Sequence, residues 1–261
     1  MQSFEDSFKN TEATAESTLK AAAAVTRAAK ALQKAAQVGN INAIKRSNAQ
    51  LKENQNTLEL EINNTVKTWK FSDDDIAEYM KTHYSEEILK HSKDIELSIF
   101  QQDGVLISYP STIQVVPNDR AIRINNKKVS DLRPSKLVSD LKRNQDKGSK
   151  LNPARFLEGL FKAYKILVGS DQSTGPSPVV KLQDVYELFT ANPGTSSEFT
   201  KMDFTRDIYL VDASEVRKTR DGSTVTFPAS RGLATGRDIF PFVGQDGTPF
   251  NYYGIKFTKA K

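Results

Sequence analysis

The stretch "TKMDFTRDIYLVDASEVRKTRDGSTVTF", residues 200–227, runs a short amphipathic helix straight into a predicted two-stranded ribbon. Thr200 and Asp203 have the spacing of a capping box, in which each side chain bonds the backbone N–H of the other at a helix start. Asp221-Gly222 is a frequent dipeptide in tight turns between two strands. The apolar face of the helix is predicted at three positions with helical spacing: Phe204, Ile208 and Val211.

The residues before this stretch predict the rest of a domain. "NPARFLEGLFKAYKILVG", residues 152–169, predicts a helix bounded by its Asn-Pro and its final Gly. A short strand "VVKL", a helix near residues 183–191 and a turn "NPGTSSEF" follow. We predict a winged helix-turn-helix for residues 152–230, because that fold has the same order of elements: helix, strand, helix, turn, helix and ribbon. Many other α+β domains carry the same turn signals, so that alternative stays open. "RDIFPFVGQDGTPFNYYGIKFTK" then predicts strands that extend the sheet.

The N-terminal part predicts long helices. Residues 11–69 are almost free of helix breakers and rich in alanine, and Gly39-Asn40 interrupts them. We expect a hairpin of two helices or one kinked helix. The second arm carries a coiled-coil seam formed by Ile41, Ile44, Leu51, Leu58, Ile62 and Trp69, with Asn48 and Gln55 among them. These helices either pack on the globular part or form a dimer or partner-binding coil. We expect the rest of the chain to fold without residues 1–70.

The middle of the chain changes to alternating apolar and polar residues between residues 95 and 129. Asp103-Gly104, "PND" and Asn125-Asn126 supply turn signals, so we predict an antiparallel sheet of about four strands. A basic helix is predicted between Pro134 and Gly148. The fold class is therefore α+β, with three domains: a helical hairpin or coiled coil over 1–94, a small β-rich scaffold with a basic helix over 95–150, and a winged-helix-like domain with extra strands over 151–261.

The composition argues against membrane and redox chemistry. With 38% apolar and 26% charged residues and no apolar run near ~20 residues, the chain predicts a cytoplasmic protein that does not cross a membrane. It has no cysteine, which excludes disulfides and cysteine-based metal sites. His83 and His91 are too far apart along a helix to predict one metal site. Phosphate-binding loops, nucleophile elbows and dinucleotide fingerprints are absent, so we predict no enzyme activity, no cofactor and no metal.

The basic residues are concentrated in two segments. The net charge is +5, and residues 1–70 hold 10 basic and 7 acidic side chains. Residues 120–150 carry 10 basic against 3 acidic residues, and residues 216–237 carry 5 against 1. Such segments suit phosphates, although a protein-docking role for the ribbon stays open. We predict contacts with double-stranded DNA at Lys201 and Arg206 on the helix, at Arg217, Lys218, Arg220, Arg231 and Arg237 in and after the ribbon, and at Lys127, Lys128, Arg133, Lys142 and Arg143 before it.

Three segments together carry a resemblance. "RPSKLVSDLKRNQDKGSKLNPARFLEGLFKAYKILVG", "FTRDIYLVDAS" and "YYGIKFT" resemble winged-helix-like accessory subunits encoded beside SMC-like coiled-coil ATPases in bacterial anti-phage defence loci. The resemblance covers residues 130–261 and carries over no individual functional residue. It implies a subunit that bridges an ATPase to DNA or to an effector.

The leading hypothesis is a non-enzymatic accessory subunit that links an SMC-like ATPase or effector to DNA, with its helical hairpin on the partner. The alternative is a winged-helix DNA-binding regulator that forms a homodimer through the coil. A magnesium-dependent nuclease built from carboxylates is the second alternative.

Overall fold

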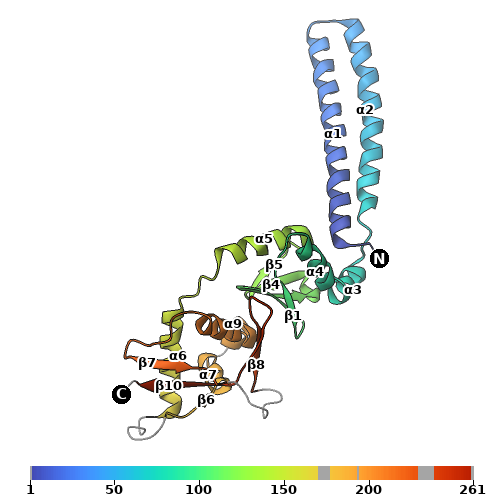
Figure 1. Ribbon diagram of the computed structural model, residues 1–261. Coiled ribbons are helices and arrows are strands. Elements are labelled where there is room, and N and C mark those ends of the chain that lie inside the picture. The colour runs from blue at the N-terminus through green and yellow to red at the C-terminus, as the bar shows by residue number, and fades with distance from the viewer. Residues whose placement is uncertain (1, 170–176, 193, 229–237, 260–261) are drawn as a thin grey trace. The chain divides into compact units, whose positions relative to one another are not determined.

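The computed structural model describes residues 2–169, 177–192, 194–228 and 238–259 (Figure 1). Arg231 and Arg237, two of the predicted DNA contacts, lie outside these residues. The chain divides into two compact units: Met1–Glu87 with Arg133–Ser135, and Ile88–Leu132 with Lys136–Lys261. The three domains predicted from the sequence, over 1–94, 95–150 and 151–261, stay a prediction. Within the described residues, no helix combines the length and apolar content that crossing a bilayer requires.

The first unit contains a helical hairpin of α1 (Phe4–Gln37) and α2 (Ile41–Thr68), as the sequence predicted (Figure 1). The side chains of α1 that turn toward α2 alternate three and four residues apart, the spacing of a coiled coil. They are mostly small, and they are Phe4, Ser7, Thr11, Thr14, Thr18, Ala21, Val25, Ala28, Leu32 and Ala35. Small residues let the helices approach closely. The register is fixed by Thr18 Oγ1, 2.8 Å from Thr65 Oγ1, and by Asn54 Nδ2, which donates to the Ala24 carbonyl at 3.1 Å.

The seam of α2 differs from the predicted one in half of its positions. Its less exposed residues are Ile44, Ser47, Leu51, Asn54, Leu58, Glu61, Thr65 and Thr68. The predicted Ile41 and Ile62 are exposed, and so are Asn48 and Gln55. The apolar pattern pointed to the wrong flank because α1 offers mainly alanine and threonine, so polar side chains that hydrogen-bond across the seam fit as well as isoleucine does.

The base of the hairpin is an aromatic cluster. Phe4 is 1% exposed, and its ring lies 4.4 Å from that of Tyr79 and 5.0 Å from that of Phe71, between centroids. Tyr79 belongs to α3 (Asp73–Thr82), which begins with the predicted capping box at Ser72. Glu87 of α4 (Tyr84–Asp94) accepts hydrogen bonds from the N–H groups of Phe4 and Glu5 and from the Tyr79 hydroxyl. This buried carboxylate satisfies backbone donors that the first turn of α1 leaves unpaired.

The second unit contains the predicted antiparallel sheet, with five strands in chain order. They are β1 (Phe100–Gln102), β2 (Val105–Ser108), β3 (Ser111–Val116), β4 (Ala121–Ile124) and β5 (Lys127–Val129), with a 3-10 turn, η1 (Pro117–Asp119), before β4. Three of its four turns lie at the predicted signals, Asp103-Gly104, residues 117–119 and Asn125-Asn126, whereas the turn between β2 and β3 at Tyr109-Pro110 was not predicted. Asn125 and Asn126 adopt positive φ angles of 47° and 66°, which asparagine tolerates better than most residues. Helix α5 (Pro134–Lys147) follows, and it buries Leu137, Val138 and Leu141.

The C-terminal elements are α6 (Pro153–Val168), β6 (Val180–Lys181), α7 (Leu182–Phe189), α8 (Thr195–Glu198), α9 (Lys201–Asp212), β7 (Ser223–Thr226), β8 (Phe240–Val243), β9 (Pro249–Tyr252) and β10 (Gly254–Lys259). Strands β6, β10 and β7 form an antiparallel sheet in that order, and β8 pairs with β9 in a separate hairpin. The predicted ribbon is reduced to a tight turn with one bridge, Lys218 to Thr224, because β7 pairs mainly with β10.

Helix α9 is the centre of this unit's core. Its capping box at Thr200 and Asp203 and its three predicted apolar positions are present. Eight of its 12 residues are buried, however, among them Thr205 and Asp207. It packs with α6 and with Phe240 of β8, whose ring centroid is 5.5 Å from that of Phe204. A helix covered on most sides has no broad face left for a DNA groove.

Candidate functional site

The two cations of α9 are engaged inside the second unit. Arg206 was expected on the outer face, but its side chain is only 14% exposed. Its guanidinium lies 3.1 Å from Asp203 Oδ1 and 2.8 Å from Asp207 Oδ1, and it donates to Asn125 Oδ1 at 2.9 Å. Burial raises the pKa of Asp207, and the charge of Arg206 opposes that shift. Arg206 therefore ties α9 to the turn between β4 and β5.

Lys201 points its ammonium at the Phe240 ring, 4.3 Å from the centroid. Burial lowers the pKa of this lysine, while Asp238 opposes the shift. A cation held over an aromatic face is stabilised by the ring electrons. Arg206 is buried as well. Helix α9, which the sequence predicted to lie in the DNA groove, therefore exposes neither cation to a phosphate.

The turn after α9 keeps two accessible cations. Arg217 lies 2.6 Å from Asp212 Oδ1, whereas Lys218 and Arg220 are exposed and have no ion pair with any residue that the structure describes. The turn is rigid, since Asp221 accepts from the Thr219 hydroxyl at 2.6 Å and from the Ser223 N–H at 3.1 Å. The bond from Thr219 lowers the pKa of Asp221.

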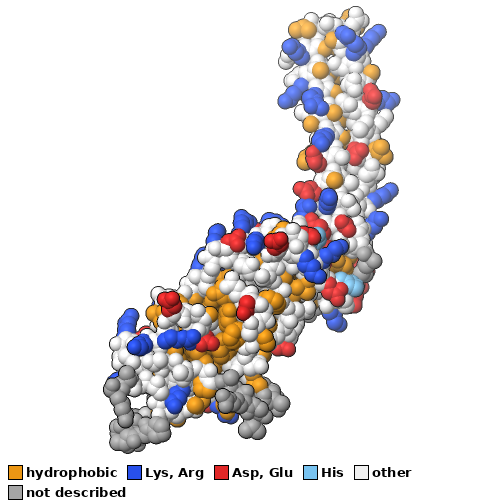
Figure 2. Space-filling view, viewed as in Figure 1, with side chains coloured by type: hydrophobic (Ala, Val, Ile, Leu, Met, Phe, Trp, Pro, Cys, Tyr) orange, Lys and Arg blue, Asp and Glu red, His pale blue; other side chains and the backbone are white. Residues whose placement is uncertain are grey.

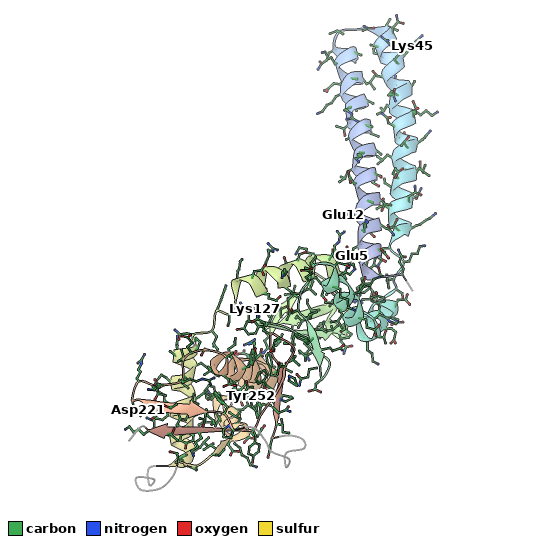
Figure 3. The ribbon with its side chains drawn as sticks, viewed as in Figure 1. Glu5, Glu12, Lys45, Lys127, Asp221 and Tyr252 are labelled. Carbon is green, nitrogen blue, oxygen red and sulfur yellow. The ribbon has the colours of Figure 1, made fainter. Side chains whose placement is uncertain are left out.

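Most of the predicted cations before α6 are also paired. Lys128 lies 3.1 Å from Asp119, Lys142 lies 3.9 Å from Asp146, and Arg143 pairs with Asp140. Arg133 belongs to the first unit, where it binds Glu5 at 3.0 Å and Glu12 at 2.5 Å. Figure 3 shows both carboxylates near the start of α1. Lys127 is exposed, and among the described residues it has no ion-pair partner.

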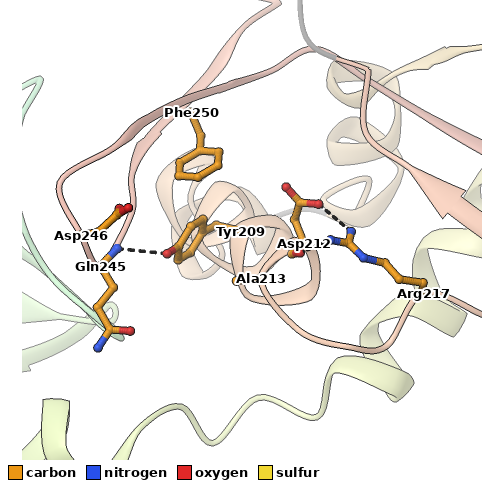
Figure 4. A pocket seen from close by; sticks show the side chains of 7 residues that line it. All are labelled: Tyr209, Asp212, Ala213, Arg217, Gln245, Asp246 and Phe250. Atoms are coloured by element: carbon orange, nitrogen blue, oxygen red, sulfur yellow. Dashed lines mark hydrogen bonds and ion pairs between the residues drawn. The ribbon is translucent and has the colours of Figure 1, made fainter.

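A concave site of about 610 Å³ lies beside the end of α9 (Figure 4). Its lining is Tyr209, Asp212, Ala213, Arg217, Gln245, Asp246 and Phe250. The Tyr209 hydroxyl accepts from the Gln245 N–H at 3.0 Å, and Asp212 accepts from Arg217 and from the Tyr252 hydroxyl. Burial, and then Asp212, raise the pKa of Tyr252. Because the Tyr209 hydroxyl bonds the backbone of Gln245, and Asp212 bonds Tyr252, these polar groups hold the β8–β9 hairpin on α9.

The described residues bring together no group of three or more His, Asp or Glu side chains with the geometry to hold a metal ion. The predicted cations also come from separate elements. Among the predicted cations that the structure describes, Lys127, Lys218 and Arg220 combine exposure with the lack of an ion pair.

The sequence prediction missed one run of cations that contains no acidic residue. Residues 17–52, here called the distal arm, contain seven Lys or Arg side chains and no Asp or Glu. They are Lys20, Arg27, Lys30, Lys34, Lys45, Arg46 and Lys52. Figure 2 shows Lys and Arg predominating around the loop end of the hairpin, and Figure 3 places Lys45 beside that loop. Counting residues 1–70 as one block averaged this run with the acidic base, whereas a shorter counting window detects it.

The hairpin also exposes apolar side chains on one flank. Leu19, Ile62 and Val66 are 70%, 45% and 75% exposed. Each comes directly after a residue that faces the seam: Leu19 after Thr18, Ile62 after Glu61 and Val66 after Thr65. In an antiparallel pair of helices, positions that follow seam residues by one lie on the same flank. We call these three residues the apolar flank. Leu60, 59% exposed, lies on the opposite flank.

No family model, no curated protein and no solved structure matches this chain.

Proposed function

We propose that the protein is a non-enzymatic accessory subunit of a bacterial, cytoplasmic complex, with a role in anti-phage defence. It links an SMC-like coiled-coil ATPase or effector to double-stranded DNA, and its helical hairpin docks on that partner. The observation that carries the proposal is the apolar flank: Leu19, Ile62 and Val66 are exposed on a hairpin whose own seam is already closed.

The partner that fits this flank is an amphipathic helix. Two antiparallel helices with apolar side chains along one flank form a groove for the apolar face of a third helix. Burying a side chain of this size contributes about 1.5–3 kcal/mol. Association costs about 4–15 kcal/mol, so three side chains need further contacts from a long partner such as a coiled coil.

The globular unit supplies a weaker, sequence-independent DNA contact in this proposal, through Lys127, Lys218 and Arg220. A winged-helix-like arrangement is supported by the element order from α6 to β10 and by the pairing of β6 with the last strand. Since α9 is buried, we propose phosphate contacts at the turn rather than base reading by the helix.

The test is co-purification with an SMC-like coiled-coil ATPase that is co-expressed with this protein. Replacing Leu19, Ile62 and Val66 by Ser should abolish co-elution, while Leu60→Ser, an exposed apolar position on the opposite flank, should not. Both variants should melt like the wild type, because the replaced side chains are exposed. Docking through this flank is contradicted if both variants still co-elute with the ATPase, and also if both fail to co-elute.

The alternative, a dimeric winged-helix regulator, is favoured by the strand order β6-β10-β7 alone. Light scattering separates the two, because a regulator is a stable dimer of 29.1 kDa chains without any ATPase. An accessory subunit elutes with its partner.

A further inference from the structure

Four cations of the distal arm share one flank of the hairpin. Lys20, Arg27 and Lys34 each follow an inward residue by two positions, so they form one edge of α1. They recur every seven residues, which at 1.5 Å per residue places them about 10.5 Å apart. Arg46 follows inward Ile44 by two positions and therefore lies on the same flank of the antiparallel pair. We call these four residues the cationic edge.

These cations are exposed, unlike Arg206 and Lys201 of α9. Lys20 pairs with Glu16 at 2.7 Å, and both side chains are largely exposed. Arg27, Lys34 and Arg46 are exposed, and no ion pair joins them to any residue that the structure describes. A solvated helix usually mixes both signs and gains from pairs four residues apart. Residues 17–52 contain no carboxylate, so apart from Lys20, which pairs with Glu16, their cations lack that gain.

We propose that the cationic edge binds the sugar-phosphate backbone of double-stranded DNA without reading bases. The edge from Lys20 to Lys34 is about 21 Å long, and at 3.4 Å per base pair it faces about six base pairs. Its side chains stand on a hairpin whose seam fixes their spacing, so little order has to be gained on binding. The cationic edge shares only the DNA partner with the proposed function, and it adds a DNA contact to that of Lys127, Lys218 and Arg220.

The charge spacing explains why the free protein tolerates the edge. At physiological salt the Debye length is about 8 Å, shorter than the roughly 10.5 Å between neighbouring cations, so their mutual repulsion is largely screened. A phosphate in direct contact is much closer and releases condensed counterions. The expected dissociation constant is that of non-specific binding, about 10⁻⁴–10⁻⁶ M.

A docked partner helix leaves the cationic edge accessible. Leu19 and Lys20 are neighbours in sequence but project to opposite flanks of the hairpin, because one follows inward Thr18 by one position and the other by two. The hairpin can thus hold protein on one flank and nucleic acid on the other.

The experiment uses the full chain and a duplex of random sequence, titrated between about 50 and about 200 mM salt. The test variant replaces Arg27, Lys34 and Arg46 by Ala. The matched control replaces Lys9, Lys67 and Lys70, which are exposed on the proximal half of the same unit. The log–log slope of affinity against salt should fall by about 2.7 in the test variant, at about 0.9 per contact, and stay unchanged in the control. A thermal melt of each variant verifies the fold.

Equal slopes for wild type and test variant overturn the proposal, and so does a wild type that shows no salt-dependent binding. A third variant, with Lys127, Lys218 and Arg220 replaced by Ala, separates this failure from failure of the proposed function. If only that variant flattens the slope, the DNA contact lies in the globular unit and the edge is not a site. Co-elution with the ATPase tests docking independently of either result.

Discussion

At the scale of single residues, buried carboxylates and the groups around them decide which cations stay accessible. Arg206 faces two aspartates and Asn125, so removing its charge leaves buried carboxylates without their cation. We predict that Arg206→Met lowers the free energy of unfolding by about 3–5 kcal/mol. Arg220→Met, at an exposed position nearby in sequence, should change it by less than about 0.5 kcal/mol. Urea unfolding measures both, and equal effects of the two changes contradict the internal role of Arg206.

Glu5 gives the first unit a defined pH dependence. Burial raises the pKa of Glu5, but hydrogen bonds from the Ser135 N–H and from Arg133 outweigh burial and hold it below the ordinary value of 4.5. A carboxyl group whose pKa is lowered by folding adds stability above that ordinary value, and the contribution is lost as the pH falls through the folded pKa. We therefore predict that Glu5→Gln melts at a lower temperature than wild type near neutral pH.

The difference between wild type and Glu5→Gln should shrink as the pH falls below 4.5. Melting curves at several pH values test this. Glu16→Gln is the control, because Glu16 is exposed and pairs only with Lys20 across one helical turn. If the difference in melting temperature between wild type and Glu5→Gln is the same at every pH, the charge of Glu5 is not its source.

At the scale of elements, the hairpin is built from matched heptads. Asn54 bonds Ala24, so residues 22–28 lie opposite residues 51–57 in the antiparallel pair. We predict that deleting both segments keeps the seam in register and leaves a cooperative melt. Deleting only 22–28 should lower the melting temperature much more, because Thr18 then loses its bond to Thr65 or the remaining pairs shift. Circular dichroism melts compare the two, and equal losses contradict a register set by heptads.

The expectation that residues 1–70 are dispensable does not fit the base of the hairpin. Phe4 and Trp69 are part of the aromatic cluster with Phe71 and Tyr79, and Glu87 caps the first turn of α1. Only the part of the hairpin beyond this cluster can be shortened without opening a core.

The sequence predicted the elements that local chemistry controls. The capping boxes at Ser72 and Thr200 start helices, and Asp103-Gly104 and Asn125-Asn126 make turns. It did not predict the surroundings of α9, because β8 and β9 come from residues far along the chain and cover the face expected to point outward. The sequence also did not predict which flank of α2 turns inward. Asn54 and Thr65 lie in the seam because they hydrogen-bond to residues of α1.

At the scale of the whole molecule, the proposed roles divide between the units. Among the residues that the structure describes, the second unit holds five of its predicted cations in ion pairs, and the polar groups of its concave site hydrogen-bond one another. The first unit carries the apolar flank and the cationic edge, each open to solvent. Partner binding and DNA binding are therefore proposed mainly for the hairpin, with the globular part in support.

The contact between Glu5 and residues 133–135 also bears on how the chain is made. Arg133 and Ser135 follow Glu5 by 128 and 130 residues. A ribosome adding about 5–20 residues per second needs about 6–26 s to cover that span. The hairpin is synthesised long before the carboxylate of Glu5 meets these partners, and all five strands of the sheet, which ends at Val129, are synthesised by then as well. The contacts of Glu5 with Arg133 and Ser135 therefore form only after residue 135 has been synthesised, and a chain stalled before residue 133 carries a hairpin without them.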